Sequence, residues 1–210
     1  MRIALIGATG FIGSAVLREA LARGHQVTGI VRHPEKLPEH RNLVARKGDV
    51  MVEPASLVAG HNAVISAFSA DRGPEQYDQH IAGYRKIIDG VKQAGVNRLL
   101  VVGGAGSLEV APGVQVVDDP EFPEEWKPSS LATREVLYLL RDEQELDWTY
   151  LSPSGAIAPG ERTGKFRLGT DQLLTDANGE SRISLEDYAV AMLDELEDPK
   201  HIRRRFTAGY

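Results

Sequence analysis

The sequence contains no cysteine among its 210 residues. This absence excludes disulfide bonds, thiolate metal sites and cysteine nucleophiles, and it is typical of a cytosolic protein. The sequence also lacks any run of about 18 apolar residues, so we expect no transmembrane helix. Its first apolar segment is short and is interrupted by glycines, which argues against a signal peptide. We therefore expect a cytoplasmic protein that makes no use of a membrane.

The sequence has fewer basic than acidic residues: 24 Lys and Arg against 30 Asp and Glu, which gives a net charge of −6. A general nucleic-acid binder needs a basic surface to neutralise phosphates, so that class is excluded. The six histidines include no pair at the spacing of metal ligands, and we expect no metal site. An apolar fraction of 42% and a charged fraction of 26% are ordinary for one globular domain.

Short apolar segments alternate with helical patterns along most of the chain. Strands are expected near residues 3–7, 26–31, 43–45, 63–67, 98–102, 147–151 and 204–208. Helices are expected near 10–23, 54–58, 76–93, 130–141 and 185–196. This alternation predicts an α/β fold, a Rossmann-type doubly wound parallel sheet in a single domain over residues 1–210. The third and fourth strands should lie on opposite sides of the first, and residues past 151 should add a small C-terminal appendage on the substrate side.

Two segments depart from this alternation. Residues 104–127 are rich in Gly, Pro and acids and are expected to form a long loop, which in compact domains is usually functional or mobile. Trp126, at the end of that loop, could cover a flat ring or anchor the loop to the body. The arginines 203–205 are expected on an edge strand, where charge prevents pairing with another chain.

A glycine triplet follows the first expected strand and opens the first expected helix, in "GATGFIG". Gly7 allows a sharp turn, Gly10 lets the backbone approach a pyrophosphate, and Gly13 lets the helix pack close to the strand. The N-terminus of that helix, at Phe11 and Ile12, offers free N–H groups and a partial positive charge. A glycine-rich turn without a ligand is the alternative. In this strand–turn–helix context the motif predicts a dinucleotide site.

The end of the second expected strand indicates which dinucleotide is bound. An NAD-binding protein places an acid there for the ribose hydroxyls, but the stretch "GIVRHPEKL" has Arg32 and reaches no carboxylate before Glu35. The planar guanidinium of Arg32 can pair with a 2′-phosphate, and Thr9 can add a hydroxyl. Arg32 could also be a solvated surface side chain. We expect NADP(H) to be preferred, with NAD(H) the less favoured cofactor.

With these residues in view, the chain resembles the atypical short-chain dehydrogenase/reductase group. More narrowly, it is similar to the NAD(P)H-binding proteins often described as NADH-flavin reductases, to biliverdin reductase B and to NmrA-like proteins. The resemblance covers the whole length and rests on "GATGFIG", "VRHPEKL", "GDV", "LLVVGGAGSL", "DWTYLSPSGAIAPGERTGKFRLGTDQLL" and "SRISLEDYAVAMLDELEDPKHIRRRFTAGY".

The resemblance implies further cofactor-binding residues at the ends of the strands. Asp49 and Val50 would flank the adenine. After the fourth strand, the residues that would line the cofactor are Ala67, Phe68 and Ser69. The residues beside the nicotinamide ribose would be Gly103, Gly104 and Ala105, and those that close over the nicotinamide would be Pro153, Ser154 and Gly155.

The chain departs from typical members of the superfamily in its catalytic residues. No tyrosine is followed four residues later by lysine, so the Tyr-x-x-x-Lys pair, in which lysine lowers the pKa of tyrosine for proton transfer, is absent. Ser107 lies roughly where the family places a serine near the substrate, and it could equally be an ordinary loop hydroxyl. It is the one candidate catalytic residue.

Two functions remain open. One is an NADPH-dependent oxidoreductase that reduces a flat conjugated small molecule such as a flavin or quinone, for which solvent can supply the proton. The other is a non-catalytic NADP(H)-binding redox sensor of the NmrA-like type. In either case the chain is expected to be a monomer or a homodimer.

Overall fold

Eight strands form one central sheet in the computed structural model, which describes all residues from 1 to 210. They are β1 (Arg2–Ile6), β2 (Gln26–Val31), β3 (Leu43–Lys47), β4 (Ala63–Ser66), β5 (Arg98–Val102), β8 (Asp147–Ser152), β10 (Arg167–Gly169) and β12 (Arg204–Gly209). Their order across the sheet is β10-β12-β8-β5-β4-β1-β2-β3. All neighbours are parallel except β10 and β12, which are antiparallel.

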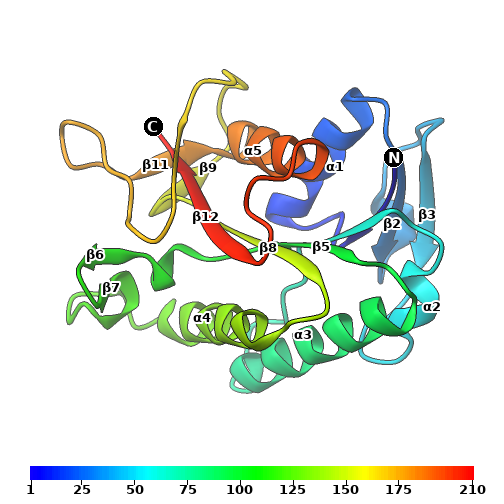
Figure 1. Ribbon diagram of the computed structural model, residues 1–210, viewed down its shortest axis with the longest axis horizontal. Coiled ribbons are helices and arrows are strands. Elements are labelled where there is room, and N and C mark those ends of the chain that lie inside the picture. Colours follow the sequence, from blue (N-terminus) through cyan, green and yellow to red (C-terminus); the bar gives the residue numbers. More distant parts are fainter.

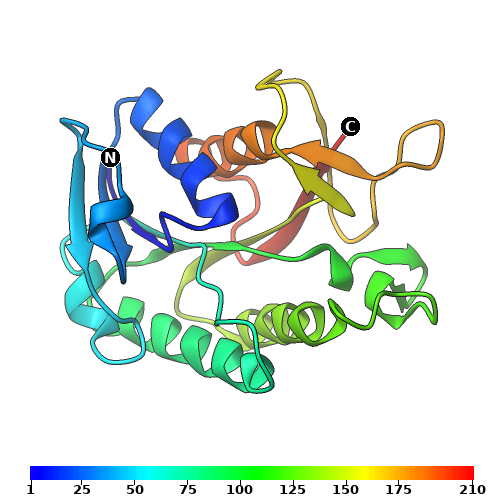
Figure 2. The ribbon, with the colours of Figure 1, turned by 180° about the vertical axis from the view of Figure 1, so that it is seen from behind.

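Helices cover both faces of this sheet (Figures 1 and 2). Helices α1 (Phe11–Ala22) and α5 (Leu185–Glu197) lie together on one face. The other face carries α2 (Pro54–Val58), α3 (Gln76–Gln93) and α4 (Lys127–Asp142). Alternate residues of each strand contribute to two apolar cores, one on each face of the sheet. For example, Leu5 and Ile65 lie in the core on the first face, and Ala4 and Val64 lie in the core on the second. Because both faces are buried, the inner strands are mostly apolar.

The predicted topology is confirmed. Strand β2 continues outward to β3, whereas β4 lies on the other side of β1. The chain therefore reverses its direction of travel across the sheet at β1. In open α/β sheets a crevice forms at such a point, outside the carboxyl ends of the strands, and ligands bind there. The fold thus places the glycine turn after β1 at the edge where a dinucleotide site is expected.

The expected long loop at 104–127 contains regular structure. It holds the 3₁₀ turns η2 (Ala105–Ser107) and η3 (Val116–Asp118) and a short hairpin of β6 (Glu109–Ala111) and β7 (Val114–Gln115). Gly113 turns this hairpin with a φ of +75°. Strands of two or three residues are too short to give a readable alternation, so the sequence pattern did not predict them.

The end of the chain also differs from the expectation. Strands β9 (Ala156–Ala158) and β11 (Arg182–Ser184) pair in parallel as a small separate sheet. Strand β10 pairs with the far side of β12 only from Thr207 to Gly209, so Arg204 and Arg205 pair with β8 alone. The expected edge position of the charged run therefore holds at Arg204 and Arg205, although β12 as a whole is an interior strand and Arg205 is buried.

Candidate cofactor site

The turn after β1 is built around glycines that nothing larger could replace without movement. Gly7 has a φ of +77°, in the left-handed region that favours glycine. A Cβ at Gly7 would lie 2.5 Å from the carbonyl oxygen of Ala67, and one at Gly13 would lie 2.1 Å from the carbonyl oxygen of Gly7. Both contacts are with backbone, which cannot rotate away. The glycines therefore bring β1, β4 and the start of α1 into close contact.

The N-terminus of α1 has no partner from the protein's own side chains. Gly10 is the N-cap residue, no side chain caps the helix, and its first turn contains no acidic residue. The N–H groups of Phe11, Ile12 and Gly13 have no acceptor within the helix. The Phe11 side chain is exposed and Ile12 packs against the core, so neither side chain lines the adjacent cavity. This end of the helix suits a pyrophosphate, which its N–H groups and its dipole would bind.

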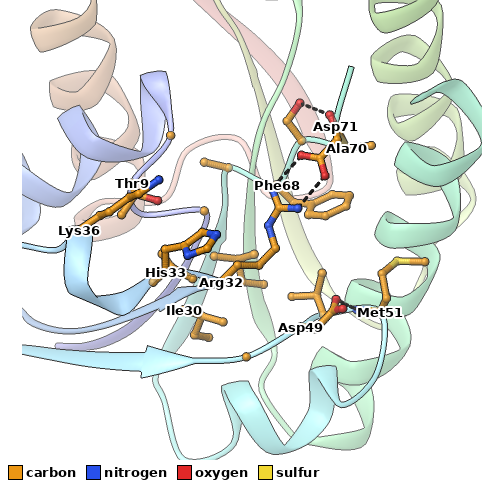
Figure 3. A pocket seen from close by; sticks show the side chains of 18 of the residues that line it. Thr9, Ile30, Arg32, His33, Lys36, Asp49, Met51, Phe68, Ala70 and Asp71 are labelled. Carbon is orange, nitrogen blue, oxygen red and sulfur yellow. Dashed lines mark hydrogen bonds and ion pairs between the residues drawn. The ribbon is translucent and has the colours of Figure 1, made fainter. Parts of the chain in front are cut away.

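A cavity of about 530 Å³ opens beside this turn, a size typical of small-ligand sites. It lies at the carboxyl ends of β1 to β4, where Figure 3 shows side chains from several segments converging. Its lining residues are Ile6, Gly7, Thr9, Gly10, Ile30, Val31, Arg32, His33, Lys36, Gly48, Asp49, Val50, Met51, Ala67, Phe68, Ser69, Ala70, Asp71 and Gln79.

One edge of the cavity is basic. Arg32 and His33 directly follow β2, and the 3₁₀ turn η1 (Pro34–Lys36) brings Lys36 toward Thr9 (Figure 3). Sequence reasoning identified Arg32 and Thr9 but missed His33 and Lys36. The signal was the proline after His33, which starts a tight helical turn and so folds the following lysine back toward the strand end. Glu35 does not line the cavity.

Two acidic residues face the same cavity from other segments. Asp71, in the segment after β4, accepts two hydrogen bonds from Arg32, with Nη1 to Oδ2 at 2.6 Å and Nη2 to Oδ1 at 2.8 Å. These hydrogen bonds hold the pKa of the Asp71 carboxyl below its usual value. Asp49 accepts a hydrogen bond from the backbone N–H of Met51 at 2.8 Å, and it thereby fixes the turn after β3.

Aromatic side chains of α3 pack against the segment after β4 and hold it in place. The Phe68 ring stacks on His80 at 5.8 Å between centroids and meets Tyr84 edge-on, also at 5.8 Å. A Cβ at Gly83 would lie 2.3 Å from the Phe68 ring, so glycine in α3 makes room for it. Burial lowers the pKa of His80 to about 4, so the ring is neutral at physiological pH.

The glycines after β5 contact a tyrosine. A Cβ at Gly103 would lie 2.2 Å from the Tyr150 ring, and the Gly104 N–H donates to Tyr150 Oη at 3.0 Å. Tyr150 Oη in turn donates to the carbonyl oxygen of Thr133 at 2.9 Å. Burial raises the pKa of Tyr150 to about 12. This hydroxyl is protonated and both donates and accepts a hydrogen bond within the protein, and Gly103, Gly104 and Ala105 lie outside the cavity.

Ser107, the candidate catalytic residue, has a buried side chain. Arg205 Nη1 donates to its hydroxyl and to its carbonyl oxygen, both at 3.1 Å. Arg205 also pairs with Asp171, to which its Nε donates at 2.9 Å. The hydroxyl of Ser107 therefore belongs to a polar network between β12 and the segment after β5.

The residues of the turn after β8 also form hydrogen bonds within the protein. Ser154 Oγ donates to the carbonyl oxygen of Ala208 at 2.9 Å, and the Gly155 N–H donates to Ser181 Oγ, also at 2.9 Å. With Pro153, these residues connect β8 to β12 and to the small β9–β11 sheet.

Apart from Phe11, Ile12 and Gly13, which form the start of α1, the predicted site residues fall into two groups. Nine line the cavity: Gly7, Thr9, Gly10, Arg32, Asp49, Val50, Ala67, Phe68 and Ser69. The other group lies at the carboxyl ends of β5 and β8: Gly103, Gly104, Ala105, Ser107, Pro153, Ser154 and Gly155. Contact between either group and a cofactor stays a prediction.

The structure brings together no three His, Asp or Glu side chains that could hold a metal ion. None of its helices combines the length and apolar character needed to cross a bilayer.

Comparison with known proteins indicates the family of this chain. The model of the family described as NAD(P)H-binding matches residues 7–199. A curated protein of Bacillus subtilis, the uncharacterized protein YwnB, is 43% identical over 99% of this chain and 97% of its own length.

Two solved structures share the fold at substantial identity. A "putative epimerase" from Bacteroides thetaiotaomicron is 52% identical with a TM-score of 0.94, covering 100% of this chain and 96% of that one. A "putative NADH-flavin reductase" from Streptococcus pneumoniae is 35% identical with a TM-score of 0.86, covering 100% and 99%. Since the family model spans nearly the whole chain and includes the glycine turn that the geometry assigns to a dinucleotide, this chain belongs to the NAD(P)H-binding family.

Proposed function

We propose that the protein is an NADPH-dependent oxidoreductase that reduces a flat conjugated acceptor of the flavin or quinone class. The observation that carries the choice of NADPH is the basic edge of the cavity, formed by Arg32, His33 and Lys36 beside Thr9. The end of β2 places no carboxylate in the cavity for the ribose hydroxyls. A guanidinium fork and an ammonium suit the additional phosphate of NADPH.

The residues present fit the cofactor. The Gly7–Gly13 turn and the uncapped start of α1 would hold the pyrophosphate, and the turn at Asp49 and Val50 would border the adenine. NADPH supplies a hydride when bound. The protein's part is to hold the hydride-donating carbon of the cofactor and the accepting atom of the acceptor about 3–3.5 Å apart and to exclude water.

The choice of acceptor follows from the absence of a free acid. Tyr150 is buried with its hydroxyl engaged by Gly104 and Thr133, and Ser107 is bound by Arg205. A ketone or aldehyde needs a proton donor as the hydride arrives, whereas a reduced flavin or quinone can take its proton from solvent. The name of the Streptococcus pneumoniae relative agrees with this acceptor class. We also propose that the small β9–β11 sheet borders the acceptor side.

A second candidate is a non-catalytic sensor of the NADP(H) redox state. The surroundings of Ser107 and Tyr150 favour it, because both side chains are buried and hydrogen-bonded to the protein itself.

The deciding experiment measures NADPH oxidation at 340 nm by the purified protein with FMN, FAD and a set of quinones. The oxidoreductase requires saturable, protein-dependent oxidation with at least one of these acceptors. NADPH binding without turnover on any of them would contradict the proposed reductase and favour the sensor, and binding of neither NADPH nor NADH would refute both.

A further inference from the structure

The ion pair between Arg32 and Asp71 joins opposite sides of the cavity. Arg32 directly follows β2, whereas Asp71 lies 39 residues later in the segment after β4, and both side chains line the cavity (Figure 3). Both side chains are also well exposed, at 63% and 70%. Ligands can therefore reach the pair, and either partner can exchange its contact with a dissolved ion.

The geometry of the pair imitates a bound phosphate. Two carboxylate oxygens of Asp71 accept from both terminal nitrogens of Arg32, at 2.6 and 2.8 Å. This is the fork-to-fork arrangement by which arginine binds phosphate oxygens. While the pair is closed, the two N–H groups best placed for a 2′-phosphate are taken. Lys36, on the same edge, forms no ion pair of its own.

We propose that Asp71 is a specificity-determining residue that competes with the 2′-phosphate of NADPH for Arg32. The proposal rests on the proposed function, since it requires that NADPH binds in this cavity with its 2′-phosphate on the basic edge. NADH carries no such phosphate, so its binding does not require the pair to open. Asp71 thus weakens NADPH binding selectively and narrows the protein's preference between the two cofactors.

The size of the effect follows from the exposure of the pair. Exposed ion pairs are weak, so the closed form exceeds the open form by only a few fold. A ligand that needs the open form loses affinity by the fraction of molecules that present it. Removing the Asp71 charge should therefore tighten NADPH binding by about 2- to 6-fold at low ionic strength.

The test compares the dissociation constants of NADPH and NADH for wild type, Asp71→Asn and Asp78→Asn, measured by cofactor fluorescence. Asp78→Asn is the matched control, because Asp78 is exposed on α3, lies outside the cavity and makes no contact with Arg32. Asp71→Asn should tighten NADPH binding within the stated range and leave NADH binding unchanged. Asp78→Asn should change neither. Thermal unfolding of both variants verifies that the fold is retained.

The alternatives are separable in the same titrations. The proposal is overturned if Asp71→Asn leaves NADPH binding unchanged, weakens it, or tightens NADPH and NADH equally. Equal tightening in Asp78→Asn would show a general charge effect, which also overturns it. If wild type binds NADH but not NADPH, the proposed cofactor preference itself is wrong. Intact NADPH binding with no effect of Asp71→Asn refutes the competition alone.

Discussion

Arg205 on β12 donates a hydrogen bond from Nη1 to the hydroxyl of Ser107, 98 residues earlier, at 3.1 Å. Arg205 is buried, and its positive charge is balanced by the carboxylate of Asp171. The serine that sequence reasoning placed near a substrate therefore holds an interior arginine. This relationship makes a structural role for Ser107 testable against a catalytic one.

Ser107→Ala should lower the free energy of unfolding by about 0.5–1.5 kcal/mol, because one hydrogen bond to Arg205 is lost while that to the Ser107 carbonyl oxygen remains. Turnover with flavin or quinone should fall by less than about 10²-fold, the lower limit for loss of a general acid. Urea unfolding and steady-state rates measure the two effects. A larger loss of turnover at unchanged stability and NADPH affinity would identify a catalytic hydroxyl.

Arg32→Ala should weaken NADPH binding by about 1–3 kcal/mol, since a charge-assisted contact to the 2′-phosphate is lost. NADH binding should stay nearly unchanged. Calorimetric titration of both cofactors measures this, with Arg41→Ala as the control because Arg41 is exposed and lies outside the cavity. Equal losses for NADPH and NADH would mean that Arg32 does not contact the 2′-phosphate.

Lys36→Ala should weaken NADPH binding less than Arg32→Ala, by about 0.5–1 kcal/mol, because an exposed ammonium acts as a screened point charge. The loss should shrink as salt is added, since screening already weakens the interaction in wild type. Titrations at low and high ionic strength provide the comparison. A salt-independent loss would point to a packing role for the lysine stem.

Gly10→Ala and Gly13→Ala should separate binding from folding. The Gly10 backbone has a φ of −73°, which alanine adopts, and its Cβ would lie 3.2 Å from the Gly7 carbonyl oxygen. Gly10→Ala should therefore retain the fold and weaken NADPH binding. Gly13→Ala should lower the free energy of unfolding by about 1–3 kcal/mol or more, because its methyl meets backbone. Denaturant unfolding and cofactor titration of both variants measure these effects, and the reverse pattern would refute the assignment of the two glycines.

His80 should make stability depend on pH. Burial lowers its pKa from 6.5 to about 4, so between these values the unfolded chain takes up a proton that the folded chain does not. The free energy of unfolding should therefore fall as pH drops through this window, by on the order of 1–3 kcal/mol from this residue. His80→Leu, which cannot titrate, should show a shallower decline in urea unfolding. Parallel profiles for wild type and variant would contradict the prediction.

The half of the candidate site proposed to bind the phosphates could be predicted from sequence, because short-range geometry determines it. Gly7 and Gly13 lie six residues apart, and their spacing alone fixes the turn. Arg32 follows from its place at the end of a strand. These features need no knowledge of the rest of the fold.

The remainder depends on contacts between distant segments. Nothing near Asp71 in the sequence points to Arg32, and nothing near Gly103 indicates that its neighbour is the Tyr150 ring. Arg205 reads as part of a charged surface run until the fold brings Ser107 and Asp171 to it. Such pairings arise from topology, which local patterns do not encode.

The position of β12 between β8 and β10 also affects how the protein is made. Strand β10 ends at Gly169, and its only partner in the sheet starts at Arg204. At about 5–20 residues per second, a ribosome needs several seconds to synthesise the intervening chain. During that interval the backbone N–H and C=O groups on one edge of β8 are unpaired, and a chaperone or a neighbouring nascent chain can bind to them. Translation speed over the codons for α5 should therefore influence the yield of folded protein.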